Sequence, residues 1–371
     1  MASITEEMVV AAFARIEEAL LRSMIRNFRK HQVDQIKEGR EWERWQSVQL
    51  AELNRYVRSN LRRTEEFAEL NKLVDRLLSD AYMEGLSRME RIKLRLMRTG
   101  LSFVKTARSL LGVPTERLDT LIGATKTDLM RAEYAVLRKA EDDYRSVILS
   151  AQIYATSGAG TYAQAIDMAT KDFLAKGIRG VVYRNGSRHS IEEYSRMAVR
   201  TAVKRAALVA EGKQRQEWGV HTIFVNYRTD ACPCCMRWVG QVLVDDVYSG
   251  GTEAEAEEQG YALLSTAMEQ GLFHPNCRDT ASTYFPGITQ LPEKPSDEEI
   301  AEAEKREAKE NALSEAKSSE RAAMRVAELS LDPGNRDAGM ERAQRWGERV
   351  GQLEVSLEDP EIQREGPSEA V

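Results

Sequence analysis

Apolar residues recur at steps of three and four along the first part of the chain, which is the period of an α-helix. Five helices are predicted there, near 8–24, 45–61, 70–83, 87–112 and 126–155. Glycine is scarce in this part, and the faces opposite the apolar stripes are polar. The pattern therefore favours an extended helical assembly over a compact enzyme.

A different pattern begins after the glycine-containing break at 157–160. A helix is predicted over 161–176 and a short strand over 180–184. Asn185-Gly186 follows that strand directly, and this dipeptide is a strong indication of a hairpin turn.

Ser190 and Glu193 have the spacing of a capping box, so a helix is expected to begin there and to run to about Trp218. Further strands are indicated over 220–226, 239–244 and 280–285, with an acidic helix or loop at 253–270. Residues 156–290 are therefore expected to form an α+β domain with a small antiparallel sheet.

Charged residues dominate the last part of the chain. Residues 297–330 favour one exposed helix with charge pairs four residues apart. A Pro-Gly-Asn sequence at 333–335 predicts a break, a shorter helix is expected over 337–354, and disorder is expected from Glu358. The predicted fold class is a mostly helical α+β protein with a helical region (1–155), a small central α+β domain (156–290) and an acidic, charged helical tail (291–371).

Length and composition limit the class of protein. With 371 residues, 42% hydrophobic and 30% charged, the chain is expected to form two or three domains. No apolar run reaches the ~18–20 residues of a membrane-spanning helix. The acidic N-terminus lacks the apolar stretch of a signal peptide, which predicts a protein made and used in a cytosol.

The net charge of −6 is unevenly distributed. It sums to about +4 over 1–150, about −1 over 151–290 and about −9 over 291–371. The strongest basic stretch consists of Arg91, Lys93, Arg95, Arg98, Lys105 and Arg108. Two interpretations stay open for it: a solvated helix face, or a surface that contacts phosphate or an acidic partner.

All four cysteines lie in one short stretch of the central domain. Cys232 and Cys235 form a C-x-x-C pair, and His274 and Cys277 form an H-x-x-C pair. Two such pairs are the usual source of the four ligands of a structural zinc ion. The sequence therefore predicts a Cys/His knuckle that binds zinc, with Cys234 as a poorer alternative ligand.

Other interpretations of these cysteines remain. In the first, the cysteines are reduced structural residues without a metal. In the second, they form a disulfide after release into an oxidising medium. A zinc deaminase is excluded, because no His-x-Glu precedes the cysteines and the Pro-Cys-x-x-Cys spacing is missing.

Several short motifs occur in a characteristic order. A Met-Ala-Val-Arg-Thr sequence at 197–201 is followed by Trp-Val-Gly-Gln-Val at 238–242, His-Pro-Asn-Cys-Arg at 274–278 and a Pro-Gly turn at 286–287. In this order the region from about 160 to 290 resembles the tailed-phage minor capsid protein 2 family and is similar to the Mu F-like head morphogenesis proteins.

That resemblance implies a non-enzymatic structural protein of the virion. It implies a place in the phage head interior or at the portal vertex, with the host cytoplasm as the site of assembly. The implied partners are the portal protein and the major capsid protein or scaffold, with packaged double-stranded DNA as a further candidate, and no membrane in the assembled state. The implied role is head assembly and DNA packaging or ejection.

Two alternatives are retained. In these, the chain is a DNA-binding accessory protein, or an ADP-ribosyltransferase-like or nuclease-like enzyme confined to 156–290.

Two arginines are given structural roles. Arg278 follows the knuckle directly and is expected to contact cysteine sulfurs or backbone carbonyls. Arg200, in the middle of its helix, is expected to pair with a carboxylate.

Overall fold

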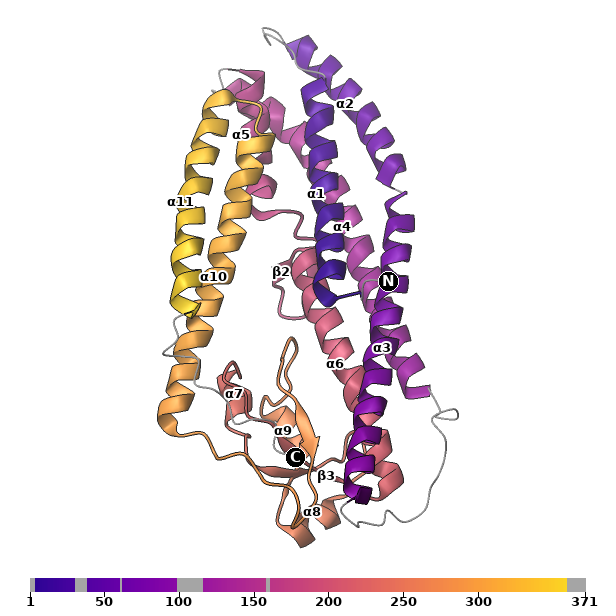
Figure 1. Cartoon of the computed structure of the whole chain (residues 1–371). Coiled ribbons are helices and arrows are strands. Elements are labelled where there is room, and N and C mark those ends of the chain that lie inside the picture. Colours follow the sequence, from indigo (N-terminus) through magenta and orange to yellow (C-terminus); the bar gives the residue numbers. More distant parts are fainter. Residues whose placement is uncertain (1–3, 31–38, 61, 99–115, 158–160, 359–371) are drawn as a thin grey trace. The chain divides into compact units, whose positions relative to one another are not determined.

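The computed structural model describes residues 4–30, 39–60, 62–98, 116–157 and 161–358. Its helices are α1 (Glu6–Lys30), α2 (Gly39–Asn60), α3 (Arg63–Arg98), α4 (Glu116–Ser157), α5 (Tyr162–Lys176), α6 (Ile191–Trp218), α7 (Pro233–Met236), α8 (Glu253–Gln259), α9 (Leu264–Glu269), α10 (Asp297–Leu329) and α11 (Pro333–Glu358) (Figure 1). Its strands are β1 (Val181–Val182), β2 (Arg188–His189), β3 (Thr222–Val225), β4 (Val242–Val244), β5 (Ala262–Leu263) and β6 (Ala281–Thr283). None of the helices described here is long and apolar enough to cross a membrane.

The chain forms two compact units, and each unit joins stretches that are distant in sequence. Unit 1 consists of the described residues in Met1–Leu73, Lys126–Arg196 and Asn311–Ser356. Unit 2 consists of those in Val74–Thr125, Met197–Glu310 and Leu357–Val371. The division into 1–155, 156–290 and 291–371 stays a prediction from composition.

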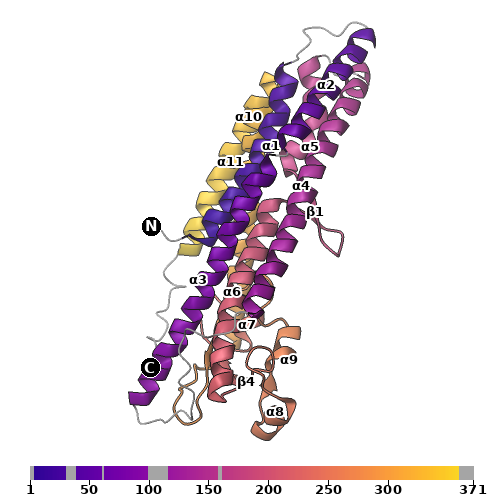
Figure 2. The same cartoon turned by 90° about the vertical axis from the view of Figure 1, so that its right-hand side faces the viewer.

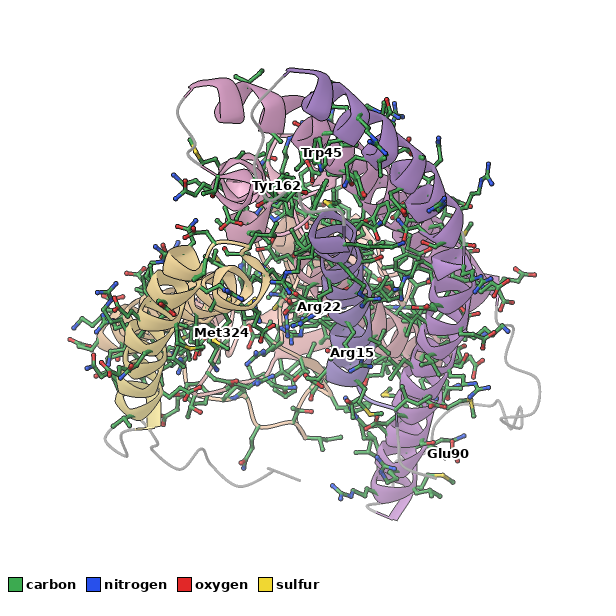
Figure 3. All side chains as sticks on the ribbon, turned by 90° about the horizontal axis from the view of Figure 1, so that it is seen from above. Arg15, Arg22, Trp45, Glu90, Tyr162 and Met324 are labelled. Atoms are coloured by element: carbon green, nitrogen blue, oxygen red, sulfur yellow. The ribbon has the colours of Figure 1, made fainter. Side chains whose placement is uncertain are left out.

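Unit 1 is helical apart from one hairpin, and aromatic residues fill part of its core. The Phe28 and Tyr144 rings lie 4.8 Å apart, and the Tyr56 ring lies 5.1 Å from that of Tyr144. Trp45 donates its indole N–H to the Tyr162 hydroxyl at 3.1 Å, and these two labelled residues lie together in Figure 3. The amphipathic pattern of α1 has its cause here, because its apolar face covers this core.

The polar residue Glu17 is also buried in unit 1. Its carboxylate accepts the backbone N–H of Ile178 at 2.8 Å and of Ile191, the first residue of α6, at 3.3 Å. Gly177 has φ +74°, and a Cβ at this position would lie 2.6 Å from Glu17 Oε1. The glycine therefore allows the chain to turn out of α5 against this carboxylate.

The hairpin and the capping box are present as predicted. β1 pairs with β2 in the register Val181 to His189 across the Asn-Gly turn, and Figure 2 shows this hairpin beside α4. Glu193 donates its backbone N–H to Ser190 Oγ at 3.1 Å, while the Glu193 carboxylate accepts the Ser190 N–H at 3.1 Å. This exchange fixes the start of α6.

Two buried carboxyl groups make unit 1 sensitive to pH. Burial raises the pKa of Glu17 and of Glu133 to about 7. For Glu133 this corresponds to a cost on the order of 3 kcal/mol for ionising the group in the folded protein. The unfolded chain ionises these carboxyl groups above about pH 4.5, whereas the folded protein keeps them protonated up to about pH 7. Their contribution to stability is therefore fully present below about pH 4.5 and is lost as the pH rises through about 7.

We expect Glu133→Gln to reduce this pH dependence. Glutamine can still accept the hydrogen bond that Asn71 donates at 3.0 Å, but it carries no charge. The stability of the variant relative to the wild type should rise between pH 5 and pH 8, in urea unfolding. A constant difference across this range would contradict the assignment. Glu69→Gln, at an exposed residue of α3, is the matched control.

Several element boundaries differ from the predicted ones. The helices expected near 70–83 and 87–112 are one continuous helix, α3, as far as Arg98, and 99–112 lies outside the described residues. α4 begins at Glu116, earlier than predicted. α11 begins at Pro333, the residue that was expected to separate the two C-terminal helices. Proline is well tolerated in a first helical turn, because its missing N–H would have no partner there.

Unit 2 contains a four-stranded sheet in the order β5-β4-β3-β6. β3 pairs antiparallel with both β4 and β6, as expected. β4 and β5 are parallel, so the small sheet, which was expected to be antiparallel, is mixed at one edge. A parallel neighbour requires a crossover connection, and α8 lies in the segment between these two strands.

The C-terminal part of α6 packs closely on the loop after β4. Arg215 is 1% exposed and binds the fully buried Asp245 at 2.8 Å. A Cβ on Gly212 would lie 2.4 Å from the Cβ of Tyr248 and 2.8 Å from its backbone carbon. The helix and the loop can therefore approach this closely only with glycine at 212.

Gly212→Ala is expected to lower the free energy of unfolding of unit 2 by about 1–3 kcal/mol, because backbone atoms must shift. Chemical denaturation of the full chain would measure this. Gly123→Ala is the control, since a Cβ there has nothing within 4 Å and alanine favours a helix. Equal stability of Gly212→Ala and the wild type would contradict the close packing.

Candidate metal centre

The first half of the site is a one-turn helix that begins at a cysteine. Cys232 is the N-cap of α7 and Pro233 occupies its first position. The Cys232 carbonyl accepts the backbone N–H of Cys235 at 3.1 Å and of Met236 at 2.9 Å. This turn directs the sulfurs of Cys232 and Cys235 to the same side.

The second half is a tight turn with unusual backbone angles. Phe273 and Asn276 have φ values of +54° and +68°, and Cys277 donates its backbone N–H to the His274 carbonyl at 3.1 Å. The His274 ring contacts the Pro275 carbonyl through Nδ1 at 2.9 Å. A carbonyl only accepts, so Nδ1 carries a proton, and Nε2 is the ring atom that can bind a metal once it has lost its own proton.

The two halves bring four donor atoms together. Cys232 Sγ lies 3.1 Å from His274 Nε2, and Cys235 Sγ lies 3.4 Å from Cys277 Sγ. All four donor atoms lie within 4.8 Å of one another. In a tetrahedral site with metal–sulfur bonds of about 2.3 Å, neighbouring sulfurs are about 3.8 Å apart. The four residues therefore fit a metal ion after only small side-chain movements.

The chemistry of the thiols also suits a cation. Hydrogen bonds from Cys235 and Cys277 lower the pKa of Cys232 far below its usual range, whereas the contact with Cys232 raises that of Cys235. The Cys232 contact raises the pKa of His274 to about 9. In the absence of a metal, the Cys232 thiol ionises readily, whereas ionisation of its neighbour Cys235 is disfavoured. A bound divalent cation would allow all three thiols to lose their protons.

α6 holds the second half through polar contacts. Arg200 donates to the Asn276 side-chain oxygen at 2.9 Å, and Thr201 Oγ accepts the Asn276 backbone N–H at 3.0 Å. Lys204 Nζ lies 3.3 Å from Cys277 Sγ and 3.9 Å from the centre of the Phe273 ring. Arg200 thus contacts an amide oxygen, and its expected pairing with a carboxylate stays a prediction.

Two residues that sequence reasoning missed lie at the cluster. Asp279 is 2% exposed, and its Oδ2 lies 3.5 Å from Cys277 Sγ and 3.7 Å from Cys232 Sγ. Arg228 binds Asp230 with two hydrogen bonds and donates to the Arg278 carbonyl at 2.6 Å, which links the two halves. The only available signal for both was their proximity in sequence to the cysteines.

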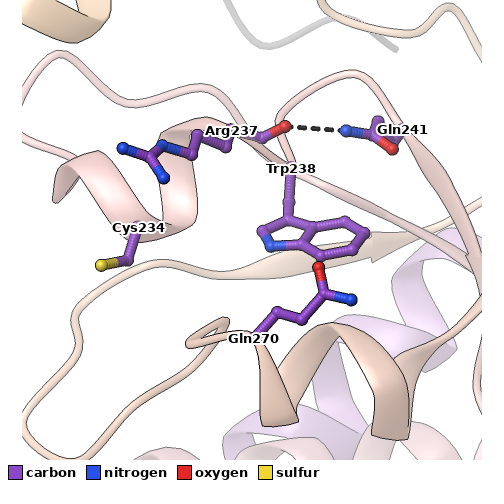
Figure 4. Close-up of a pocket in the computed structure, with 5 residues that line it drawn as sticks. All are labelled: Cys234, Arg237, Trp238, Gln241 and Gln270. Atoms are coloured by element: carbon purple, nitrogen blue, oxygen red, sulfur yellow. Dashed lines mark hydrogen bonds between the residues drawn. The ribbon is translucent and has the colours of Figure 1, made fainter.

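Cys234 and Arg278 have exposed side chains. Cys234 lines an open hollow of about 270 Å³ together with Arg237, Trp238, Gln241 and Gln270, shown in Figure 4. Its sulfur lies outside the four-residue cluster that could hold a metal. The roles proposed for Cys234 and Arg278 from sequence, as alternative ligand and as supporting contact, stay predictions.

The predicted basic stretch begins in the last turns of α3. Arg91 and Arg95 are exposed and Lys93 is half-buried. Arg98 is the last residue of the helix, and Lys105 and Arg108 lie outside the described residues. The structure therefore places two of the six side chains on the surface, one turn apart.

A comparison with known families decides the affiliation. The chain matches the family model of phage minor capsid protein 2 over residues 3–349. The chain belongs to the phage minor capsid protein 2 family. No curated protein and no solved structure matches this minor capsid protein.

The two most specific motifs of the minor capsid protein meet in space. Met-Ala-Val-Arg-Thr supplies Arg200 and Thr201, and both contact Asn276 of His-Pro-Asn-Cys-Arg. The family match is also broader than the resemblance of 160–290, because it includes the N-terminal helices and most of the C-terminal ones. Membership of this family places the minor capsid protein in the virion.

A second polar cluster has the residue types of a hydrolase triad. Ser187 Oγ lies 3.0 Å from His189 Nε2, and His189 Nδ1 lies 3.2 Å from Glu193 Oε2. The Ser187 hydroxyl donates to Asn185 Oδ1 at 2.7 Å, so its proton is directed away from the histidine. Glu193 also serves as the capping residue of α6. These contacts are therefore best explained as stabilising the β1–β2 hairpin and the start of α6.

Proposed function

We propose that this protein is a minor structural component of a tailed-phage head, associated with the portal protein and the major capsid protein or scaffold. It acts in head assembly and in DNA packaging or ejection, without catalytic turnover. It resides in the head interior or at the portal vertex and is recruited from the host cytoplasm.

One observation carries this proposal. The family match extends over 3–349, so it covers the helices of both units as well as the cysteine-containing part. A match limited to the cluster would have been compatible with a shared metal-binding module on an unrelated protein. Long helices with polar outer faces also suit a protein that docks on other subunits.

The metal is proposed to be zinc, with Cys232, Cys235, His274 and Cys277 as its ligands. Three thiolates and one imidazole are a typical tetrahedral zinc set. Four protein ligands leave no open position for a reactive water, so the proposed ion is structural. When bound, zinc supplies a cross-link between two turns that are distant in sequence.

Quantitative mass spectrometry of gradient-purified particles and procapsids tests the proposed role. We expect the protein at a low and fixed ratio to the portal protein. Its absence from both kinds of particle would overturn the structural role. It would favour the retained alternatives, a DNA-binding accessory or an enzyme confined to 156–290.

Contact with packaged DNA is proposed for the exposed arginines of α3. Replacing Arg91 and Arg95 with glutamate is expected to weaken DNA binding by about tenfold or more at low salt, because phosphate contacts dominate such affinities. Fluorescence anisotropy with a short duplex at several salt concentrations measures this. Arg131→Glu on α4, whose arginine is also exposed, is the control. Unchanged affinity of the double variant would remove DNA from the partners of this helix.

A further inference from the structure

The two halves of the metal centre are attached to different helices of unit 2. The His274–Cys277 turn is held by α6 through Arg200, Thr201 and Lys204, as described above. The other half, from Tyr227 to Met236, contacts the beginning of α10. The ligands of the centre therefore come from two turns that are supported by two separate helices.

The contacts with α10 are both apolar and polar. Ala231 and Met236 pack with Ala303 of α10 in a small buried cluster, against which Tyr227 and Ile300 also lie. Arg306 of α10 donates to the Ala231 carbonyl at 2.9 Å. Ala231 directly precedes the ligand Cys232, so α10 contacts the backbone that positions this sulfur.

The first turns of α10 make two further contacts with the same half: Tyr227 donates its hydroxyl to the Glu299 carboxylate at 3.3 Å, and Arg237 lies 3.7 Å from Glu304. The sequence over 297–310 is rich in Glu, Lys and Ala, and such a helix is only marginally stable without tertiary contacts. Ala303 is its one fully buried residue before Arg306. Docking of this part of α10 therefore depends on the shape of the α7 turn.

We infer that metal binding controls whether the first part of α10, residues 297–310, is docked on unit 2. This inference rests on the proposed zinc site and deepens it. With the ion bound, Cys232 and Cys235 fix the α7 turn, and Ala231, Met236 and the Ala231 carbonyl are presented to α10. Without the ion, the α7 turn keeps the Arg228 link but loses the cross-link through its ligands to the α6-supported half, and α10 loses its fixed docking surface.

The consequence concerns the link between units. α10 begins in unit 2 and its later residues, from Asn311, belong to unit 1. Release of 297–310 would thus free the unit 2 part of this helix while the sheet of unit 2 stays folded. Metal binding would therefore control the docking of the chain segment that leads out of unit 2.

Hydrogen exchange of the full-length protein, measured by mass spectrometry with and without EDTA under reducing conditions, tests this inference. Metal content is measured on the same samples. We expect amides of 297–310 to exchange at least about tenfold faster after metal removal, while β3 keeps its protection. Unchanged exchange over 297–310, or acceleration only together with β3, overturns the inference while leaving the zinc site intact. A purified protein that binds no zinc overturns the zinc site and the inference together.

Variants distinguish the effect of the metal from that of the hydrogen bond between Arg306 and the Ala231 carbonyl. Arg306→Met is expected to keep about one zinc per chain and still to accelerate exchange over 297–310, because it removes the bond to the Ala231 carbonyl. Cys234→Ser should match the wild type in both measurements. Normal protection of 297–310 in Arg306→Met, or in a Cys277→Ser variant that has lost its metal while β3 stays protected, would overturn the inference.

Discussion

Replacing Cys235 with serine is expected to remove the metal from the full-length protein and to destabilise unit 2 by several kcal/mol. Cys235 is fully buried, and its sulfur lies 3.4 Å from that of Cys277 in the other half of the cluster. Structural zinc contributes an apparent ~10–16 kcal/mol in small zinc-finger peptides. Unit 2 has its own sheet and core, so only part of that free energy should be lost here.

Metal analysis and thermal unfolding measure this effect. The wild-type melting temperature should fall on addition of a chelator, whereas that of Cys235→Ser should already be low and should not respond. Cys234→Ser is the matched control, because this neighbouring cysteine is exposed. If Cys234→Ser loses the metal and Cys235→Ser retains it, the ligand set is wrong.

Asp245→Asn is expected to cost about 3–5 kcal/mol, because it leaves the Arg215 charge buried without its partner. Arg215 is 1% exposed, and its other carboxylate neighbour, Glu211, is 3.9 Å away and already binds Arg88 at 2.9 Å. The substitution keeps the side-chain oxygen that accepts the Tyr248 N–H. The loss therefore reports on the charge and not on the loop.

Urea unfolding of the full chain at neutral pH gives this value. Glu304→Gln serves as the control, because its pair with Arg237 is 3.7 Å long and more than half exposed on both sides. Exposed pairs contribute about 0–1 kcal/mol. Equal effects of the two substitutions would show that the Arg215–Asp245 pair is solvated in solution.

The sequence predicted the elements whose pattern is local. The capping box at Ser190 and the Asn-Gly hairpin turn depend on a few neighbouring residues, and both are present. α3 was divided wrongly at Gly85, although its buried positions Tyr82, Leu86 and Met89 continue the helical period. That glycine lies within a continuous helix, and a Cβ there would be 3.0 Å from the Ala207 carbonyl oxygen of α6.

The candidate site shows the same limit. The spacing of the cysteines and the histidine indicated which four residues come together, because each pair lies in one turn. Lys204 and Arg306 could not be found in this way, since their contacts with Cys277 and with the Ala231 carbonyl depend on how α6 and α10 pack in three dimensions. β5 was missed because two residues carry no periodic pattern.

The discontinuous composition of unit 1 has a consequence for synthesis on the ribosome. Glu18 of α1 binds Arg325 at 3.0 Å, yet the two residues are 307 positions apart. At ~5–20 residues per second, roughly 15–60 s pass between the appearance of the two partners. During this time the nascent α1 lacks part of its final environment. Co-translational folding of this protein should therefore finish late, and a chain that terminates early would leave the first helix without its α10 partner.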